Sequence, residues 1–269
     1  MKLFLYCSAL LLATDAGSTP LFDDPTPSQR AEIAPTGKLR VGVVSAPAQS
    51  AFFVVKDSDG EPRGVTVDLG KELGHKLGVP VGFFVASNSG ELVDAVSSAA
   101  LDVAFMPIDE QRRERVDFGP VYFIIESTYL VRAGSDIKSL SDVDRPNVRV
   151  VGIANTATIR GAARSLKNTT IAAVKSVGEA TELLRAGGAD AFALTHDALP
   201  PLAARLPGSR ILDGSFMQTG IAIAVPKNRP NALAYATAFM EYAKASGAVR
   251  RAFDDAGLND LAVAPPSAW

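Results

Sequence analysis

Cysteine is almost absent from this sequence: its 269 residues include one, Cys7, close to the amino terminus. A lone thiol excludes a disulfide within the chain, and it leaves no cysteine for a zinc site or a nucleophile in the remainder. Histidine is nearly as rare, with His75 and His196 alone. No spacing typical of metal ligands or of a Ser-His-Asp triad stands out. We therefore expect no metal, no cofactor and no catalytic residues.

The chain has no large excess of charge of one sign, because it contains 27 basic and 29 acidic residues and its formal net charge is −2. The lysines and arginines are spread along the chain. A chain that binds nucleic acid or an anionic membrane surface usually carries a basic cluster. We therefore expect neither partner.

Long apolar runs are missing except at the amino terminus, where Lys2 precedes the run Leu3–Ala13. This run is shorter than the roughly 20 residues that span a bilayer, and small residues follow it. The pattern predicts a signal peptide over residues 1–16, a flexible tether rich in Pro, Ser, Thr and Asp over residues 17–36, and a periplasmic location.

The segment from residue 102 to residue 122 combines several features of a ligand site. Val103–Met106 is an apolar run that predicts a buried strand, and Pro107 ends it. Asp109 can cap the polar turn that follows. This turn carries Arg112, Arg113 and Arg115, and an aromatic-Gly-Pro turn at Val116–Pro120 closes the unit. Ligands of open α/β sheets bind at the carboxyl ends of strands, where an arginine can pair with a carboxylate. Alternatively, the arginines are solvated surface charge.

Strand and helix patterns alternate through the first half of the chain. Lys38–Val44 predicts a strand, Asp57–Gly64 a hairpin turn, and Leu69, Leu73 and Leu77 the inner face of a helix that ends at Gly78. A strand at Pro80–Val85 and a further helix come next. This order predicts an α/β layer with a mainly parallel sheet.

The same alternation begins again after the long strand pattern Tyr122–Val131. Arg149–Ile153 predicts a strand, and Thr156 is a natural N-cap for the next helix. After a strand at Gly220–Val225, the last helices have no sheet of their own and must pack on the first lobe. The sequence thus predicts a two-lobed α/β clamshell with two hinge crossings, with lobe 1 at residues 37–128 and 224–269 and lobe 2 at residues 129–223.

This order of motifs resembles the family 3 periplasmic solute-binding proteins, with their type II periplasmic binding fold, from about Gly37 to Gly257. The matching pieces are Gly37–Gly42, Asp59-Gly60, Leu101–Ala104, Arg112 with Val116-Asp117-Phe118, Asn155-Thr156, Gly188–Ala191 and Gly220–Ala222. The resemblance implies an extracytoplasmic protein that binds an amino acid or a related organic acid between two lobes and delivers it to an ABC permease.

The resemblance also implies site residues. The family's carboxylate-binding arginine lies five residues before the Asp-Phe pair, which selects Arg112, while Arg113 and Arg115 keep a surface role. The family's second-lobe Gly-Thr corresponds to Asn155 and Thr156.

Other positions depart from the family. Phe105 and Pro107 stand at places that carry small or hydroxyl-bearing residues in the family. Its acid for an α-amino group corresponds to Thr195, with Asp197 two residues later. Phe52, in the loop after the first strand, can stack on a ligand or lie in the core. A carboxylate ligand is thus better supported than an α-amino acid.

Two other functions remain open at this stage. An enzyme on the same fold, resembling cyclohexadienyl dehydratases, would draw its acid–base groups from His196, Asp197, Asp109 and Glu126. A ligand sensor would signal to a partner protein. We favour the binding protein, and we expect a monomer.

Overall fold

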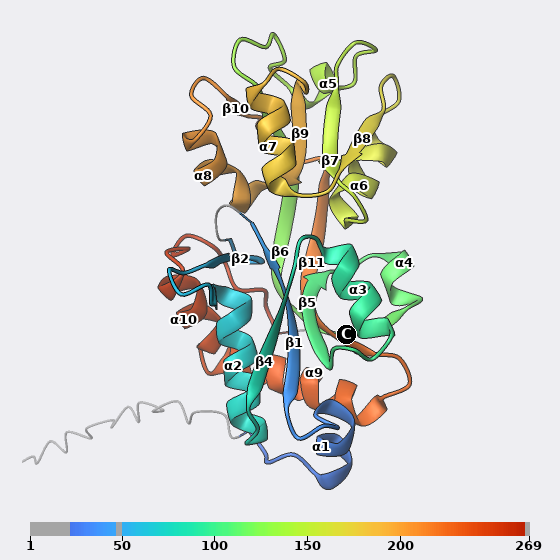
Figure 1. Ribbon diagram of the computed structural model, residues 1–269, viewed down its shortest axis with the longest axis vertical. Coiled ribbons are helices and arrows are strands. Elements are labelled where there is room, and N and C mark those ends of the chain that lie inside the picture. The colour runs from blue at the N-terminus through green and yellow to red at the C-terminus, as the bar shows by residue number, and fades with distance from the viewer. Residues whose placement is uncertain (1–21, 47–49, 267–269) are drawn as a thin grey trace, which may run out of the picture.

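The computed structural model describes residues 22–46 and 50–266, which form two lobes (Figure 1). The lower lobe, lobe 1, is built from both ends of the described chain. Its elements are α1 (Pro27–Ile33), β1 (Leu39–Ser45), β2 (Phe53–Lys56), β3 (Pro62–Arg63), α2 (Val65–Leu77), β4 (Val81–Ala86), α3 (Ser89–Ser97), β5 (Val103–Pro107), α4 (Glu110–Arg113), α9 (Pro230–Ala245) and α10 (Ala248–Asp255).

Lobe 2, the upper lobe of Figure 1, holds the middle of the chain. Its elements are α5 (Leu140–Val143), β7 (Val150–Ile153), α6 (Ala157–Ser165), β8 (Ile171–Val174), α7 (Val177–Arg185), β9 (Ala191–Thr195), the 3₁₀ helix η1 (His196–Ala198), α8 (Leu199–Ala204) and β10 (Arg210–Ile211).

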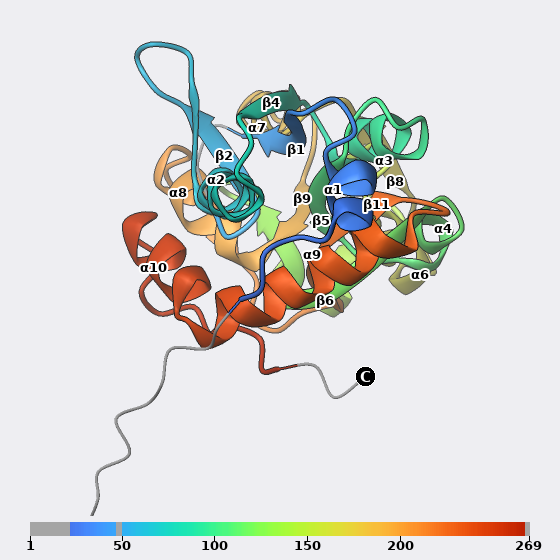
Figure 2. The ribbon, with the colours of Figure 1, turned by 90° about the horizontal axis from the view of Figure 1, so that it is seen from below.

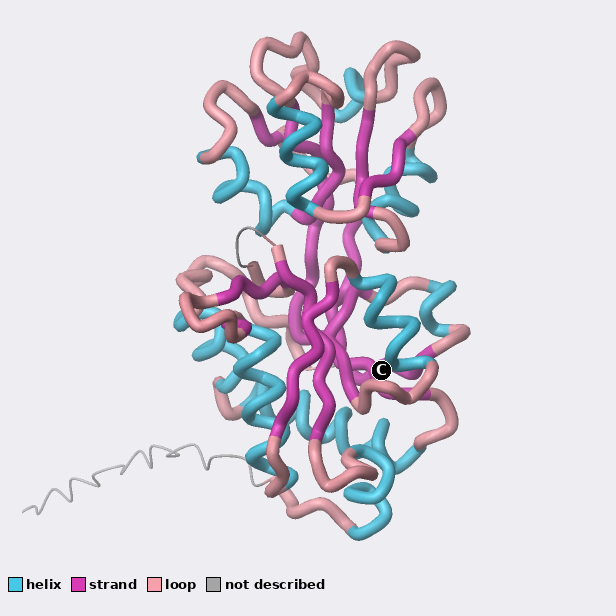
Figure 3. The backbone as a smooth tube through the Cα atoms, viewed as in Figure 1, coloured by secondary structure: helices cyan, strands magenta, loops and turns pink. Residues whose placement is uncertain are grey.

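Two long antiparallel strands, β6 (Val116–Val131) and β11 (Met217–Pro226), run through both lobes (Figure 3). At one end β11 pairs with β5 of lobe 1, and at the other end β6 pairs with β9 of lobe 2. The predicted two-lobed α/β fold with two crossings is confirmed. The residue limits given above for each lobe stay a prediction.

The described strands form one continuous sheet in the order β3-β2-β1-β5-β11-β6-β9-β7-β8, and off this path β4 pairs with β1 and β10 with β6. Pairing is parallel from β1 to β4 and β5, and again from β7 to β8 and β9. Helices cover the sheet in each lobe, and Figure 2, a view from below, shows α1 and α9 side by side in lobe 1. The carboxyl ends of β1, β5, β7 and β9 point toward the region between the lobes.

The predicted first helix is confirmed, because Leu69, Leu73 and Leu77 are buried on α2 and Gly78 ends it with a φ of 66°. This helix begins at Val65, about one turn before Leu69. The expected hairpin is present between β2 and β3, although its second strand is only Pro62–Arg63.

The predicted turn at Val116–Pro120 is wrong, because these residues are the beginning of β6. The pairing with β11 shifts register twice along this stretch, between Ile221 and Ala222 and between Ala222 and Ala224. Such irregularities leave residues of one strand without a partner, so the missing N–H of Pro120 breaks no ladder bond.

The predicted flexible tether is wrong for residues 22–36, since these residues pack on lobe 1. The ring of Phe22 lies 5.2 Å from that of Tyr235, and Glu32 accepts hydrogen bonds from the backbone N–H groups of Asn231 and Ala232 at the start of α9. Aromatic burial and capping supply the contacts that composition did not reveal. The predicted signal peptide, Cys7 and the first part of the tether lie outside the described residues.

Within residues 22–46 and 50–266, no helix has the length and the apolar character needed to cross a membrane.

Candidate ligand-binding site

Arg112 differs from its two neighbouring arginines in burial. It is 2% exposed, whereas Arg113 and Arg115 are exposed and Arg115 pairs with Asp94 at 2.8 Å on the surface. The carboxylate of Asp109 caps α4 by accepting the Arg112 N–H at 3.0 Å. This short helix directs the Arg112 side chain back toward the end of β5, whereas the other two side chains remain in solvent.

The Arg112 guanidinium contacts both lobes. In lobe 1, Nη1 donates to the Pro107 carbonyl at 2.7 Å and Nη2 to Ser89 Oγ at 2.6 Å. Across the cleft, Nη2 also donates to the Asn155 carbonyl at 3.1 Å. Arg112 Nε has no hydrogen-bond partner among the described residues, although Asp109 Oδ2 lies 3.5 Å away.

Positive charge exceeds negative charge around Arg112. Burial lowers the pKa of Arg112 to about 10, with nearby Asp109 opposing the shift, so the guanidinium is charged at neutral pH. Arg160 on α6 pairs with the same Asp109 carboxylate. Two guanidinium groups thus share one carboxylate, and this partly buried cluster carries one unbalanced positive charge. An anion bound here would be stabilised.

The lobe 2 side is formed by Asn155, Thr156 and the start of α6. Asn155 has a left-handed φ of 59°, a conformation that asparagine adopts more readily than most residues. Thr156 is the N-cap, as predicted: its Oγ1 accepts the Ile159 N–H at 3.2 Å and donates to the Ile153 carbonyl at 2.8 Å. Asn155 packs against Gly90 of α3, where an added Cβ would lie 2.4 Å from the Asn155 Cβ. Glycine at position 90 therefore permits this contact between the lobes.

A small cavity lies between the lobes beside these residues. Its walls come from the carboxyl ends of the strands and from the helix starts that follow them, namely Phe52, Phe53, Asn88, Ser89, Pro107, Ile153, Thr156, Thr158, Ala193, Leu194 and Thr195. The cavity volume is about 20 Å³, enough for roughly one water molecule. The lobes are therefore closed, and an organic solute can enter only when they separate.

The structure gathers most of the predicted residues here. Phe52, Pro107, Thr156 and Thr195 line the cavity, and Arg112 and Asn155 meet beside it. Phe105 lies apart, fully buried with its ring 6.0 Å from that of Tyr122.

Sequence reasoning missed other cavity residues, notably Ser89 and Thr158. Both occupy the first turn of a helix that follows a strand, and Asn88 and Thr156 cap those helices. Ser89 and Thr158 could have been found from the sequence, because each lies one or two residues after an N-cap residue that follows a predicted strand.

Asp197 connects lobe 2 to lobe 1. Its Oδ2 accepts the Ala51 N–H at 3.1 Å, and the Ala51 carbonyl in turn accepts the Tyr122 hydroxyl at 2.8 Å. Burial raises the pKa of Asp197, although the hydroxyls of Thr195 and Ser50 act in the opposite direction. His196 and Glu126 line a separate pocket of about 400 Å³ near residues 260–265, which Asp197 also borders.

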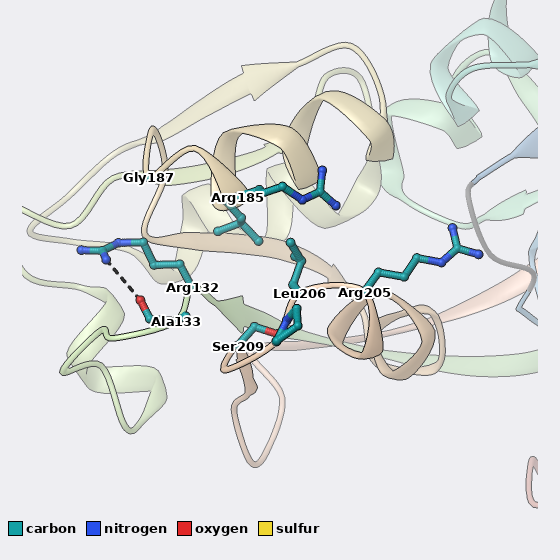
Figure 4. Close-up of a pocket in the computed structure, with 9 residues that line it drawn as sticks. Arg132, Ala133, Arg185, Gly187, Arg205, Leu206 and Ser209 are labelled. Carbon is teal, nitrogen blue, oxygen red and sulfur yellow. Dashed lines mark hydrogen bonds between the residues drawn. The ribbon is translucent and has the colours of Figure 1, made fainter.

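A further pocket, of about 290 Å³, lies in lobe 2 away from the cleft (Figure 4). Arg132, Arg185 and Arg205 border it, but the guanidinium of Arg132 points away from those of the other two. These side chains therefore form no common anion site. Among the described residues, no group of three or more His, Cys, Asp or Glu side chains could hold a metal ion.

The geometry defines a class of protein: two α/β lobes that close on a small site holding a buried arginine. The family model for bacterial extracellular solute-binding proteins, family 3, matches residues 39–255. The chain belongs to this family, as the resemblance implied.

Relatives agree with this assignment. The glutamine-binding protein of Geobacillus stearothermophilus is 25% identical over 74% of this chain and 77% of its own length. A mutant of ArgBP from T. maritima superposes with a TM-score of 0.74 at 26% identity, covering 84% of this chain and 98% of that chain. An ancestral amino acid-binding protein described as a precursor of cyclohexadienyl dehydratase superposes with a TM-score of 0.71 at 27% identity. The match covers 83% of this chain and 97% of that chain. These relatives are named as binding proteins.

Proposed function

We propose that this solute-binding protein closes its two lobes on a small carboxylate-bearing solute, an amino acid or a related organic acid, and delivers it to an ABC permease in the membrane. One observation carries the proposal: a buried arginine, Arg112, reaches across the cleft within a cluster that has one positive charge too many. We further propose that the protein works as a monomer in the periplasm after export by residues 1–16.

Binding would begin with the lobes apart. Separation breaks the contact from Arg112 Nη2 to the Asn155 carbonyl, because this bond joins opposite lobes. A solute carboxylate could then take the place of that carbonyl on the charged guanidinium. Closure would bring the amino terminus of α6, capped by Thr156, toward the same anion, where the helix dipole favours negative charge. The solute would thus be held from both lobes.

An enzyme on this fold is the second candidate, in view of the similarity to a dehydratase precursor. Its acid–base groups would have to reach the solute. His196 and Glu126, however, border the separate pocket and not the cavity between the lobes. Asp109 is shared between Arg112 and Arg160. The arrangement therefore favours binding without chemistry.

Replacing Arg112 tests the proposal. We expect Arg112→Ala to weaken binding by about 2–5 kcal/mol, because the solute carboxylate loses its buried charge partner. Calorimetry would measure affinity after a thermal-shift screen of the twenty amino acids and their 2-hydroxy and 2-oxo analogues, in which a bound solute raises the melting temperature.

Arg115→Ala is the matched control, since Arg115 is an exposed arginine three residues away. It should leave affinity unchanged. Circular dichroism would establish that both variants fold. If a folded Arg112→Ala protein bound the solute as tightly as the wild type, the carboxylate clamp would be wrong.

A further inference from the structure

The pocket that His196 and Glu126 border takes no part in the proposed function. Its volume of about 400 Å³ lies within the usual range of small-molecule sites, roughly 300–1,000 Å³. Its walls come from three segments: the middle of β6, the start of η1 in lobe 2, and residues 260–265, which follow α10 of lobe 1. We call it the hinge pocket, because β6 is one of the two strands that join the lobes.

The hinge pocket has apolar walls that nothing in the described chain covers. Phe123 and Ile124 of β6 line it together with Leu261 and Val263. The Ile124 side chain is 51% exposed, and among the described residues Phe84 is the other large hydrophobic residue with comparable exposure. Apolar surface that is left exposed within a hollow is typical of a binding site. An apolar chain that covered these walls would be stabilised by leaving water.

The rim of the hinge pocket is acidic. Glu126, Asp197 and Asp260 all border it. Glu126 accepts a hydrogen bond from the Gln218 side-chain amide at 2.6 Å, which is a neutral partner. Among the described residues, no lysine or arginine forms an ion pair with any of these three acids. The group that complements this rim is therefore a cation.

Two basic side chains hold the segment after α10, but both have carboxylate partners of their own. Lys244 Nζ donates to the Pro265 carbonyl at 3.1 Å and pairs with Glu241 at 2.9 Å. Arg250 donates to carbonyls of the same segment and pairs with Asp254 at 2.8 Å. Neither basic side chain lines the hinge pocket. The acidic rim thus keeps its preference for a cation from outside the chain.

We propose that the hinge pocket is a second binding site, and that it takes a small organic cation with an apolar chain, such as an alkylammonium ion. The ammonium binds at the rim that Glu126 and Asp260 form, and the chain lies against Phe123 and Ile124. This site is distinct from the solute site, because no residue lines both the hinge pocket and the cavity between the lobes.

Probes of equal chain length and different charge test this proposal. The full chain, labelled with ¹⁵N, would be titrated with n-hexylammonium, 1-hexanol and hexanoate, and amide signals of residues 123–126, 196–197 and 260–265 would be followed by NMR. We expect hexylammonium to bind about fivefold more tightly than 1-hexanol at these residues and hexanoate to bind most weakly, because the rim attracts a cation and repels an anion.

Chain length tests the apolar walls. Each methylene group that is buried strengthens binding roughly three- to fourfold. We therefore expect n-butylammonium to bind roughly tenfold more weakly than n-hexylammonium. Equal affinities of the two amines would show that the ammonium alone is recognised and that the walls take no part.

Variants test the residues of the hinge pocket. Glu126→Gln combined with Asp260→Asn should weaken hexylammonium binding about five- to tenfold and leave 1-hexanol binding unchanged, because only the charge of the rim is lost. Ile124→Thr, which keeps a β-branched side chain in the strand, should weaken both probes about equally. Glu114→Gln removes an exposed carboxylate that does not line the hinge pocket, and it should behave as the wild type.

Three results would overturn the proposal: hexanoate that binds at these residues as tightly as hexylammonium, a double variant that binds hexylammonium as the wild type does, or signals that do not saturate. Shifts concentrated at Ser89 and Thr156 would also overturn it, because they would place the amine in the cavity between the lobes. None of these titrations involves the solute, so their failure would leave the proposed function standing.

Discussion

At the scale of single residues, some charged side chains are buried in this protein and others form pairs on its surface. Arg112 and Asp197 are both shielded from solvent, and Arg112 Nε and Asp197 Oδ1 each lack a hydrogen-bond partner among the described residues. The nearby surface pairs, such as Arg115 with Asp94, need no such partner because water surrounds them.

The carboxylate of Asp197 should reduce stability at neutral pH. Burial raises its pKa in the folded state, so folded and unfolded chains are both protonated below about pH 4, the usual range of an aspartate. As the pH rises through the folded pKa, the folded state must hold a buried charge. Asp197→Asn should therefore stabilise the protein at pH 7 by about 1–3 kcal/mol.

Thermal unfolding of wild type and Asp197→Asn between pH 3 and pH 8, without solute, would measure this difference. It should shrink to nothing at the acidic end. Tyr122, which faces the same loop, stays protonated throughout because burial raises its pKa well above its usual value. A variant less stable than wild type at pH 7 would show that Asp197 holds the lobes together more than its charge destabilises them.

At the scale of elements, helix capping connects distant parts of the chain. Glu32 of α1 accepts two backbone N–H groups at the start of α9, at 2.8 and 3.0 Å, and the Asn231 side-chain amide at 2.6 Å. This helix of the described chain is thus hydrogen-bonded to a helix about 200 positions later. This contact makes residues 22–36 part of lobe 1.

Loss of this cap should be measurable. Glu32→Ala should lower the free energy of unfolding by about 1 kcal/mol, the usual effect of removing a helix cap. Urea unfolding followed by circular dichroism would measure it. Glu61→Ala, at an exposed position before β3, serves as the control and should change stability little. Equal stability of both variants would mean that α1 does not support α9.

At the scale of the whole molecule, polar contacts hold the lobes closed. Arg112 reaches the Asn155 carbonyl, Arg160 pairs with Asp109, and Asp197 accepts from Ala51. Such contacts lower the free energy of the closed form before any solute arrives. The proposed complex is closed as well, so contacts between the lobes would also stabilise the bound form, and losing one would weaken binding.

Arg160→Ala should therefore open the protein. The pair that it removes is partly exposed, and we expect a loss of about 0.5–1 kcal/mol of closure energy, which corresponds to a few-fold weaker binding. Small-angle X-ray scattering without solute should show a larger radius of gyration. Arg164→Ala, an exposed arginine one turn later on α6, should behave as the wild type. An unchanged radius in Arg160→Ala would show that this pair does not hold the lobes.

The resemblance to a known family selected Arg112 from the three arginines, by its distance from Asp117. The sequence by itself determined the alternation of strands and helices and the cap at Thr156. These features depend on local periodicity and on hydrogen bonds within a few residues. The Gly-Pro pair in β6 was wrongly interpreted as a turn. Its place in a strand becomes clear only from the pairing with β11, which shifts register beside it.

Tertiary structure alone decided what the candidate site contains. The contact of Arg112 with Asn155, the sharing of Asp109 with Arg160, and the hydrogen bond from Ala51 to Asp197 all depend on how closely the two lobes approach. No local pattern encodes that distance, because it is set by the packing of residues far apart in the chain.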